Sequence, residues 1–416
     1  MNLKIKQLIN YINLFSCILL VATSIYYYPA QKIAFILFFG SFIIELFSDQ
    51  KWRKIKFDRR TFYFTIMFLF FLLALIYYPF DPSKKYFFGL LSKRLSVLGF
   101  AGVGFFGLND KYKLSYFLNT LIISSVVAIL YLIFYRIGIV SFILNPDRAT
   151  VFTEQRILYV NSHMAFNFYL NISIVSIWFI LTQSWRRTIW WKRYLYIGAL
   201  TIDFGILAIS EGRSGFLAGI FVMFIFIFFE IWKRKKSMGI IIGLLFPFFL
   251  FGVASLHKRM SEKMLEGEPR LFLWESAVSV IKDKPIAGYG ISSAQEHFDV
   301  AREKYQTEEF RLEGMKSYRL DAHDQYLQTT MEFGLIGLLI LLFLYVFPIF
   351  IVEKNRKLFS FLILLLCAYQ SVFDMFITGQ FSSLFGILIV LILIVNNNLV
   401  IEDTRKHLKK PINTSL

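Results

Sequence analysis

Residues 216–232 read FLAGIFVMFIFIFFEIW, a run of apolar side chains with one acid, Glu230, near its end. Residues 65–78, TIMFLFFLLALIYY, repeat the pattern. A helix of about 20 apolar residues crosses the hydrocarbon core of a bilayer, and these runs reach that length when extended. The whole chain is 57% hydrophobic, with 49 Phe and 22 Tyr among its 416 residues, whereas a soluble domain has roughly 45–50% apolar residues. The sequence therefore predicts an all-α, polytopic membrane protein.

Lys and Arg are concentrated in alternate connecting segments, among them KWRKIKFDRR (51–60), WRRTIWWKR (185–193) and KRKK (233–236). Cytoplasmic loops carry such an excess, so both termini are expected in the cytoplasm, and MNLKIK is not expected to begin a cleaved leader. About twelve transmembrane helices are predicted, at about 9–28, 31–48, 61–80, 95–108, 114–138, 160–182, 194–210, 216–232, 238–256, 332–352, 358–378 and 382–399.

Several function classes are disfavoured. The net charge of +17 lies between membrane spans, where cations set orientation and attract anionic lipid, so no nucleic-acid partner is expected. GVGFFG (102–107) has dinucleotide-fingerprint spacing, but inside an apolar span its glycines are expected to let helices approach closely. Cys17 and Cys367 both fall in predicted spans. The sequence contains no Walker loop, H-E-x-x-H or Asp-x-Asp motif, so neither cofactor nor metal is expected.

The domain organisation is dominated by one long connection, residues 257–331, expected on the non-cytoplasmic side and helical. It separates residues 1–256, with spans one to nine, from residues 332–416, with spans ten to twelve and a cytoplasmic tail. After Pro269, helical apolar spacing is found at Leu271, Trp274, Ala277, Val278 and Ile281. KDKPIAGYG (282–290) is predicted to end this helix in a turn, and SSAQEHFDVAREKYQTEEF (292–310) to form a polar helix on the surface.

One histidine precedes the tenth span, in LDAHDQYLQTTMEFG (320–334). If Asp321 caps that helix, His323 lies in its first turn, where the helix dipole disfavours an added proton. A neutral imidazole at the membrane surface is a candidate general base. The alternative is a solvated interfacial histidine.

Two arginines are expected on the same side of the membrane. Arg213 lies in SEGRSG (210–215), a glycine-containing turn that leads into a span and resembles an anion site. Arg270 lies in a helical first turn, where the dipole disfavours a cation; a residue that breaks a local rule often does so for function. A surface or orienting cation is the alternative for each. Arginines bind diphosphate bidentately without a metal.

Three segments, in this order, resemble the O-antigen ligase and polymerase superfamily of bacterial inner-membrane enzymes. SEGRSGFLAGI (210–220) is similar to a Ser-Arg-Ser/Gly turn before a span. RLFLWESAVSVIKDKPIAGYG (270–290) is similar to an R-x-x-x-W-x-x-A segment ending in Pro–Gly-x-Gly. AHDQYLQTTMEFGLIGLLILL (322–342) is similar to a His-Asn-x-Tyr-Leu and Glu-x-Gly-x-x-Gly segment, and NSHMAFNFYL (161–170), with His163, is a weaker match.

The resemblance implies an inverting, metal-independent glycosyltransferase with a GT-C-like fold and an active site facing the periplasm. The catalytic histidine of the family falls on His323, and its diphosphate-binding arginines fall on Arg213 and Arg270. Asp324 stands where Asn is common, and is expected either near the diphosphate or as a helix cap. The matching residues Trp274, Tyr326 and Glu332 are expected to support the site.

The possible functions differ in the molecule that accepts the glycan. An O-antigen ligase of lipopolysaccharide biosynthesis would move a glycan from undecaprenyl diphosphate to a lipid A–core hydroxyl, whereas a polymerase would join lipid-linked repeat units. Polymerases often carry two large external loops and one is expected here, which favours a ligase. Protein O-glycosylation is a third choice. A twelve-span transporter is disfavoured because the connection after the sixth span is short and the long one follows the ninth.

Overall fold

The computed structural model describes residues 3–25, 28–81, 83–109, 111–138, 163–185, 188–210, 213–256, 270–305, 320–378 and 381–396. Within these ranges the protein is helical, with an isolated bridge between Lys113 and Asn396, so the all-α class is confirmed. The helices are α1 (Leu3–Thr23), α2 (Tyr28–Ser48), α3 (Arg59–Tyr77), α4 (Phe87–Ser92), α5 (Leu95–Phe106), α6 (Leu114–Tyr131), α9 (His163–Ser184), α10 (Trp190–Ile209), α11 (Arg213–Arg234), α12 (Lys236–Leu256), α14 (Arg270–Asp283), α15 (Ile291–Tyr305), α17 (Gln325–Val346), α18 (Pro348–Ile351), α19 (Lys357–Gln370) and α20 (Ser382–Leu393).

Eight helical segments of the described chain are long and apolar enough to cross a membrane, as expected for a polytopic helical membrane protein. Each of the twelve predicted spans overlaps a helix, but twelve exceeds the number that length and composition support. α19 has 14 residues and α20 has 12; at about 1.5 Å per residue, both are shorter than a bilayer core. α10 and α12 also fall outside the eight. α4 and α5 together form one candidate span, Phe87–Phe106, where only 95–108 was predicted.

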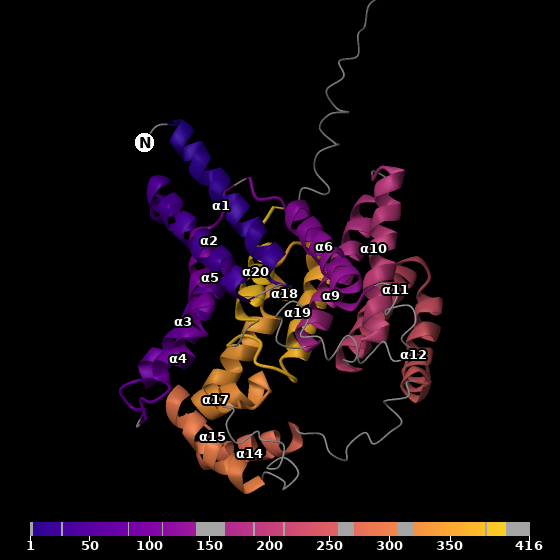
Figure 1. The fold of residues 1–416 in the computed structure, drawn as a ribbon. Coiled ribbons are helices and arrows are strands. Elements are labelled where there is room, and N and C mark those ends of the chain that lie inside the picture. Colours follow the sequence, from indigo (N-terminus) through magenta and orange to yellow (C-terminus); the bar gives the residue numbers. More distant parts are fainter. Residues whose placement is uncertain are drawn as a thin grey trace, which may run out of the picture.

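The bundle is built around α9, of whose membrane-length segment 89% is buried. α6, α10, α11 and α19 pack against it. Figure 1 shows α1, α2, α3 and α5 on one flank, α10–α12 on the other, and α17–α20 between them. Of the three glycines of GVGFFG, Gly104 allows the expected close approach, because a Cβ there would lie 2.2 Å from the Phe64 ring of α3, whereas Gly102 and Gly107 have nothing of the described chain within 4 Å of an added Cβ.

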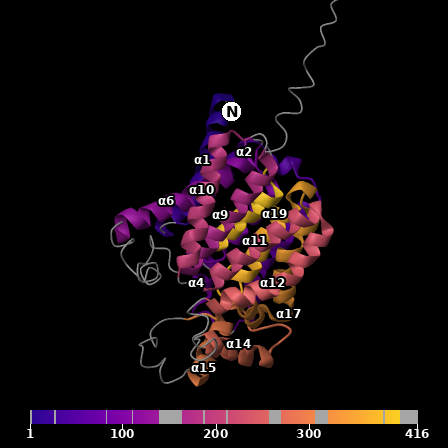
Figure 2. The same ribbon diagram turned by 90° about the vertical axis from the view of Figure 1, so that its right-hand side faces the viewer.

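α14 and α15 form a layer of their own beneath one end of the bundle (Figures 1 and 2). The helix predicted after Pro269 is confirmed, and it ends at Asp283, two residues into the segment predicted as a turn. The prediction that the following helix lies on the surface is wrong for its first half, because Ile291, Ala294 and Phe298 are fully buried. These residues pack where α15 meets α4, α14 and α17.

α17 is broken at Gly334, whose φ of 63° and ψ of −157° are not helical. The turn 285–290 fills the break: Tyr289 N donates to Met331 O at 3.0 Å, and Leu335 N donates to Pro285 O at 2.9 Å. A Cβ on Gly334 would lie 2.1 Å from the Ile286 carbonyl oxygen. Only glycine fits such a contact at positive φ. The Pro–Gly-x-Gly and Glu-x-Gly segments are therefore the two sides of one backbone contact, called here the 285–290/334 joint.

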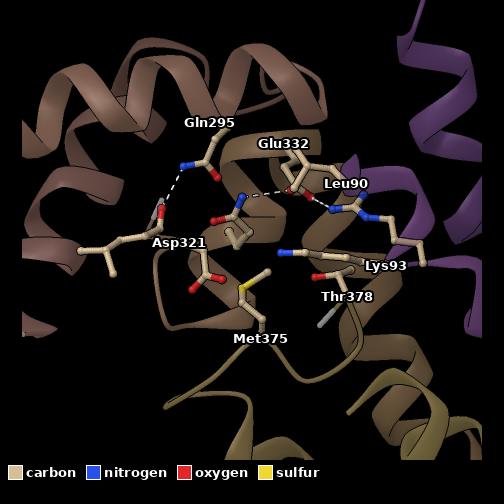
Figure 3. Close-up of a pocket in the computed structure, with 10 residues that line it drawn as sticks. Leu90, Lys93, Gln295, Asp321, Glu332, Met375 and Thr378 are labelled. Carbon is tan, nitrogen blue, oxygen red and sulfur yellow. Dashed lines mark hydrogen bonds and ion pairs between the residues drawn. The ribbon is translucent and has the colours of Figure 1, made fainter. Parts of the chain in front are cut away.

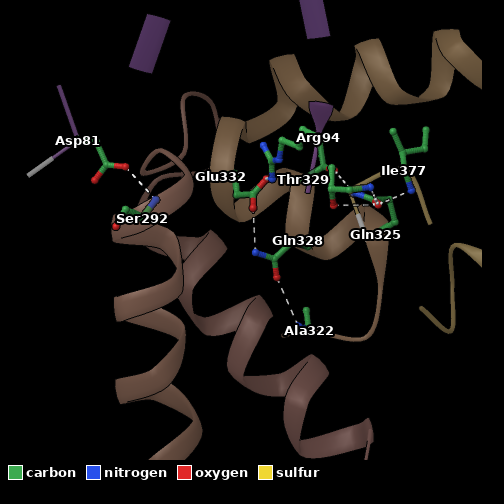
Figure 4. Close-up of polar contacts among 10 residues, drawn as sticks. Asp81, Arg94, Ser292, Ala322, Gln325, Gln328, Thr329, Glu332 and Ile377 are labelled. Carbon is green, nitrogen blue, oxygen red and sulfur yellow. Dashed lines mark hydrogen bonds and ion pairs between the residues drawn. The ribbon is translucent and has the colours of Figure 1, made fainter. Parts of the chain in front are cut away.

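Hydrogen bonds to a distant loop also fix the start of α15. Asp81, in the loop after α3, accepts hydrogen bonds from Ser292 N at 2.9 Å and Ser293 N at 3.0 Å, the first of which is drawn in Figure 4. The first N–H groups of a helix have no partner within the helix, so Asp81 supplies from a distant loop the acceptor that a neighbouring N-cap residue normally provides.

Candidate active site

His323 lies in the segment that precedes α17. Asp324 is the N-cap of that helix and accepts from Leu327 N at 2.8 Å. The prediction that Asp321 caps the helix and places His323 in its first turn is therefore wrong. Asp321 instead accepts from His323 N at 3.1 Å. His323 has a φ of 45°, a conformation that residues other than glycine adopt rarely and that clusters at functional sites.

The His323 side chain is partly buried. Its Nδ1 atom is buried, lacks a hydrogen-bond partner within the described chain and lies 3.6 Å from Asp321 Oδ1. The side chain is 36% exposed, so this exposure belongs to the other ring atoms. A neighbouring carboxylate favours an imidazolium, so Asp321 is placed to stabilise the ring after it accepts a proton.

Arg270 begins α14, as predicted, and reaches the turn 371–378. Its Cζ lies 5.7 Å from the centre of the Phe373 ring. The next residue, Asp374, is buried; burial and the Asp321 carboxylate raise the pKa of its carboxyl to about 6, against the opposing effects of His323 and Arg270. The same turn accepts a hydrogen bond at Ser371 O from Gln325 N, two residues after His323, at 2.7 Å. Arg270 and the segment of His323, far apart in the chain, thus meet at one turn.

Arg213 begins α11, and its side chain lies outside the described part of the structure. The next residue can be placed, because the Tyr369 hydroxyl donates to Ser214 O at 3.1 Å. The Tyr369 ring also lies 5.1 Å from the Phe373 ring, the ring under Arg270. The first turn of α11 therefore approaches the same turn as Arg270.

His163 begins α9, and its side chain likewise lies outside the described part. Its neighbour Met164 contacts Arg270, with 3.3 Å between the Met164 Sδ and Arg270 Nη2 atoms. α11 lies close to α9 here, because Asn171 Nδ2 donates to Gly215 O at 2.9 Å and a Cβ on Gly215 would lie 2.4 Å from Asn167 Cβ. The starts of α9, α11 and α14 thus converge.

Glu332 is almost completely buried, with its Oε2 atom 2.5 Å from Arg94 Nη2. Its Oε1 accepts from Gln328 Nε2 at 3.0 Å, and Gln328 Oε1 accepts from Ala322 N at 3.3 Å (Figure 4). These contacts link Arg94, the N-cap of α5, through α17 to Ala322, the residue before His323. A buried ion pair of this kind is strongly destabilised when one partner is removed.

The other matched residues differ in their contacts. The Tyr326 hydroxyl donates to Ala368 O at 2.8 Å and ties α17 to α19. Burial raises the pKa of Asp324 to about 6, while hydrogen bonds from the Leu327 and Tyr326 backbone lower it. The Trp274 Nε1 atom is buried without a hydrogen-bond partner among the described residues.

A pocket of about 40 Å³ lies beside these residues, between α4, α5, α15, α17 and the turn 371–378. Figure 3 shows the Lys93 side chain directed into it, close to Asp321. Its polar lining consists of Lys93, Arg94, Gln295, Asp321, Gln328, Glu332 and Thr378. The pocket thus gathers two cations and two carboxylates beside the segment of His323, whose own side chain is not part of the lining.

Two residues near the candidate site, Lys93 and Asp374, were not predicted from the sequence. Lys93 was counted only as an external loop cation, although a cation on the expected non-cytoplasmic side runs against the positive-inside bias. Asp374 was included in an apolar span, where a rare acid is itself a functional signal. Both signals were present, but neither identifies a partner.

Comparison with known proteins agrees with this geometry. A family model described as O-antigen ligase matches residues 198–342, the region from α10 to α17 that contains Arg213, Arg270 and His323. A candidate polysaccharide ligase of Rickettsia typhi is 29% identical over 144 residues, 33% of this chain and 35% of that protein. One of Rickettsia felis is 32% identical over 179 residues, 41% of each chain. The chain thus spans about a third of the first of these relatives and two fifths of the second. Over residues 198–342, this chain is therefore similar to the O-antigen ligase family.

Proposed function

We propose that this protein is an O-antigen ligase-type glycosyltransferase, which moves a glycan from undecaprenyl diphosphate to a lipid A–core hydroxyl. The observation that carries the proposal is that Arg270 and the segment of His323 meet at one turn, 371–378. The Arg270 Cζ atom lies 5.7 Å from the Phe373 ring, and Gln325 N, two residues after His323, donates to Ser371 O at 2.7 Å. The matched family and the name polysaccharide ligase of the relatives support a glycan as substrate.

The reaction needs two operations from the protein. Arg270, with Arg213 at the start of α11, binds the diphosphate and stabilises the negative charge that develops on its departing oxygen. His323 takes the proton of the acceptor hydroxyl as that oxygen attacks the anomeric carbon and the bond to the diphosphate breaks. Asp321, 3.6 Å from Nδ1, stabilises the resulting imidazolium. The displacement inverts the anomeric centre and requires no metal in this scheme.

The membrane arrangement belongs to the same proposal. We infer a GT-C-like protein of the bacterial inner membrane in which α10, α12, α19 and α20 complete twelve spans. Residues 1–256 carry the first nine spans, residues 257–331 form the periplasmic layer with α14 and α15, and residues 332–416 carry the rest. Both termini are then cytoplasmic and His323 faces the periplasm.

The proposal is tested with purified protein in liposomes, supplied with an undecaprenyl-diphosphate glycan and lipid A–core. His323→Ala should lower the transfer rate by about 10³-fold, within the range of a lost general base, with an unchanged unfolding temperature. Arg270→Ala should lower it by about 10²–10³-fold. His297→Ala, in α15, is the control and should retain activity. Normal transfer by His323→Ala, or strong inhibition by EDTA, would contradict the mechanism.

The product separates ligase from polymerase. Glycan attached to lipid A–core supports the ligase. Longer lipid-linked chains formed without consumption of lipid A–core would show that the same residues serve a polymerase.

A further inference from the structure

A larger hollow lies at the opposite end of the bundle from the candidate active site. It is a groove of about 1340 Å³ between the last turns of α9 and α11 and the segment that leads from α18 into α19. α11 begins beside the candidate active site and lines the groove from Phe226 to Arg234, 13 to 21 residues after Arg213. At about 1.5 Å per residue, these positions lie about 20–32 Å along the helix from its start. The groove therefore cannot hold the group that reacts near His323.

The walls of the groove are aromatic and aliphatic. The Trp178 and Phe226 rings stack with 5.6 Å between their centres, and the Phe179 and Phe359 rings lie 4.5 Å apart. Ile227, also in the lining, is 42% exposed. An apolar surface of this kind at membrane depth is suited to acyl chains.

The mouth of the groove is cationic. Lys233, Arg234, Lys354 and Lys357 line it together with a single acid, Glu230. Lys233 pairs with Glu230 at 2.8 Å, whereas the other three cations are exposed and form no ion pair within the described chain. The groove thus combines an apolar interior with a rim of three cations that are unpaired within the described chain.

Trp185 also lines the groove and indicates its depth. It is 46% exposed, and its ring lies 5.1 Å from the Arg193 guanidinium. Tryptophan is enriched at the membrane–water interface. The basic rim therefore lies at the level of lipid headgroups.

We propose that this groove binds an anionic phospholipid, with its acyl chains on the aromatic walls and its phosphate among Arg234, Lys354 and Lys357. The volume exceeds the roughly 300–1,000 Å³ of small-molecule pockets, as a two-chain lipid requires. Basic pockets between membrane helices hold anionic headgroups. A soluble acidic protein would neutralise the rim but leave the walls uncovered. This binding site is separate from the proposed glycan transfer and does not depend on it.

The test is native mass spectrometry of the full chain released from detergent after titration with phosphatidylglycerol or phosphatidylcholine. The wild-type protein should retain phosphatidylglycerol preferentially. The variant Arg234→Gln/Lys354→Gln/Lys357→Gln should bind it roughly a hundredfold more weakly, because each cation contributes about a fivefold factor. The matched control is Arg53→Gln/Lys56→Gln/Arg59→Gln, which removes three exposed cations before α3, at the same end of the bundle but outside the groove. It should bind phosphatidylglycerol like the wild type.

Three results would overturn the proposal: equal weakening in both triple variants, equal retention of phosphatidylcholine, or displacement of phosphatidylglycerol by a single-chain polyprenyl phosphate at lower concentration. Ile227→Trp keeps the cations but fills the wall, so it should also release the lipid, and retention there would contradict binding in the groove. His323→Ala should bind phosphatidylglycerol normally even if it transfers no glycan, so failure of either proposal is recognised separately.

Discussion

The α17 helix and the residues just before it differ in how their buried polar atoms are satisfied. Within α17, Gln325 accepts from Ile377 N at 2.9 Å and donates to Thr329 Oγ1, and Gln328 bonds to Glu332 and Ala322. The atoms before α17 and beside it, His323 Nδ1 and Trp274 Nε1, are buried without partners in the described chain.

This difference separates scaffold from site. The hydrogen bonds of Gln325 and Gln328 specify one arrangement of the helices, whereas each unsatisfied buried group costs about 1–3 kcal/mol. Arg94 belongs to both groups: its Nη2 atom pairs with Glu332, while its Nε and Nη1 atoms are buried without a partner among the described residues, next to the pocket that Arg94 lines. Changes in the α17 network should therefore reduce stability first, and changes beside it should reduce transfer first.

The largest effect is expected for Glu332→Ala. It leaves the Arg94 guanidinium buried without its carboxylate, which should lower the free energy of unfolding by about 3–5 kcal/mol. Thermal unfolding in detergent measures this loss. Glu230→Ala is the control, because that acid pairs with Lys233, whose side chain is 62% exposed, and its loss should change stability by less than about 0.5 kcal/mol. A stable but inactive Glu332→Ala would move Glu332 from scaffold to site.

Gly334→Ala should follow. The added Cβ overlaps the Ile286 carbonyl, 2.1 Å away, and strains a positive φ, at a combined cost of about 3 kcal/mol when the turn 285–290 is expelled. Faster amide hydrogen exchange at Tyr289 and Leu335 would report the opening. Gly102→Ala, in a helix with nothing within 4 Å of the new Cβ, should not destabilise. Unchanged exchange in Gly334→Ala would disprove the joint.

A smaller effect is expected for the pH dependence of Asp374. Its pKa is raised from 3.8 to about 6 by burial, so the folded state holds its proton more tightly than the unfolded state. The stability from this group is full below about pH 3.8 and is lost as the pH rises through 6, a change on the order of 2 kcal/mol. Asp374→Asn should remove this decline between pH 4 and 7.5 in unfolding measurements. Asp283→Asn, at an exposed position, should retain it, and parallel profiles for Asp374→Asn and wild type would show that Asp374 does not titrate in this window.

The smallest change in stability is expected for Trp274→Phe, which removes a donor that has no partner within the described chain. Stability should stay within about 0.5 kcal/mol of wild type, while transfer falls roughly tenfold if the N–H group contacts substrate. Trp190→Phe, at an exposed position, should affect neither. A less stable but fully active Trp274→Phe would assign this indole to the scaffold.

The local sequence pattern predicted the positions of the helices, but it did not predict which residue caps the N-terminus of α17. The apolar spacing from Leu271 to Ile281 and the Pro before it predicted the helix α14, because such a helix needs only neighbouring residues. The cap of α17 was placed on Asp321 instead of Asp324, since both acids satisfy the same local preference. The burial of α15 was missed because Asp81, more than 200 residues earlier, supplies its N-terminal acceptor.

The sequence by itself determined a helical membrane protein and singled out Arg270 and His323, because hydrophobic length, helix-end preference and motif order are local properties of a chain. Tertiary structure alone decided that Arg270 and the start of α17 both contact the turn 371–378, that Lys93 points into the adjoining pocket, and that the turn 285–290 fills the break in α17. Those relations depend on helix packing across long separations in the chain, where many pairings suit the same local pattern and only close contact selects one.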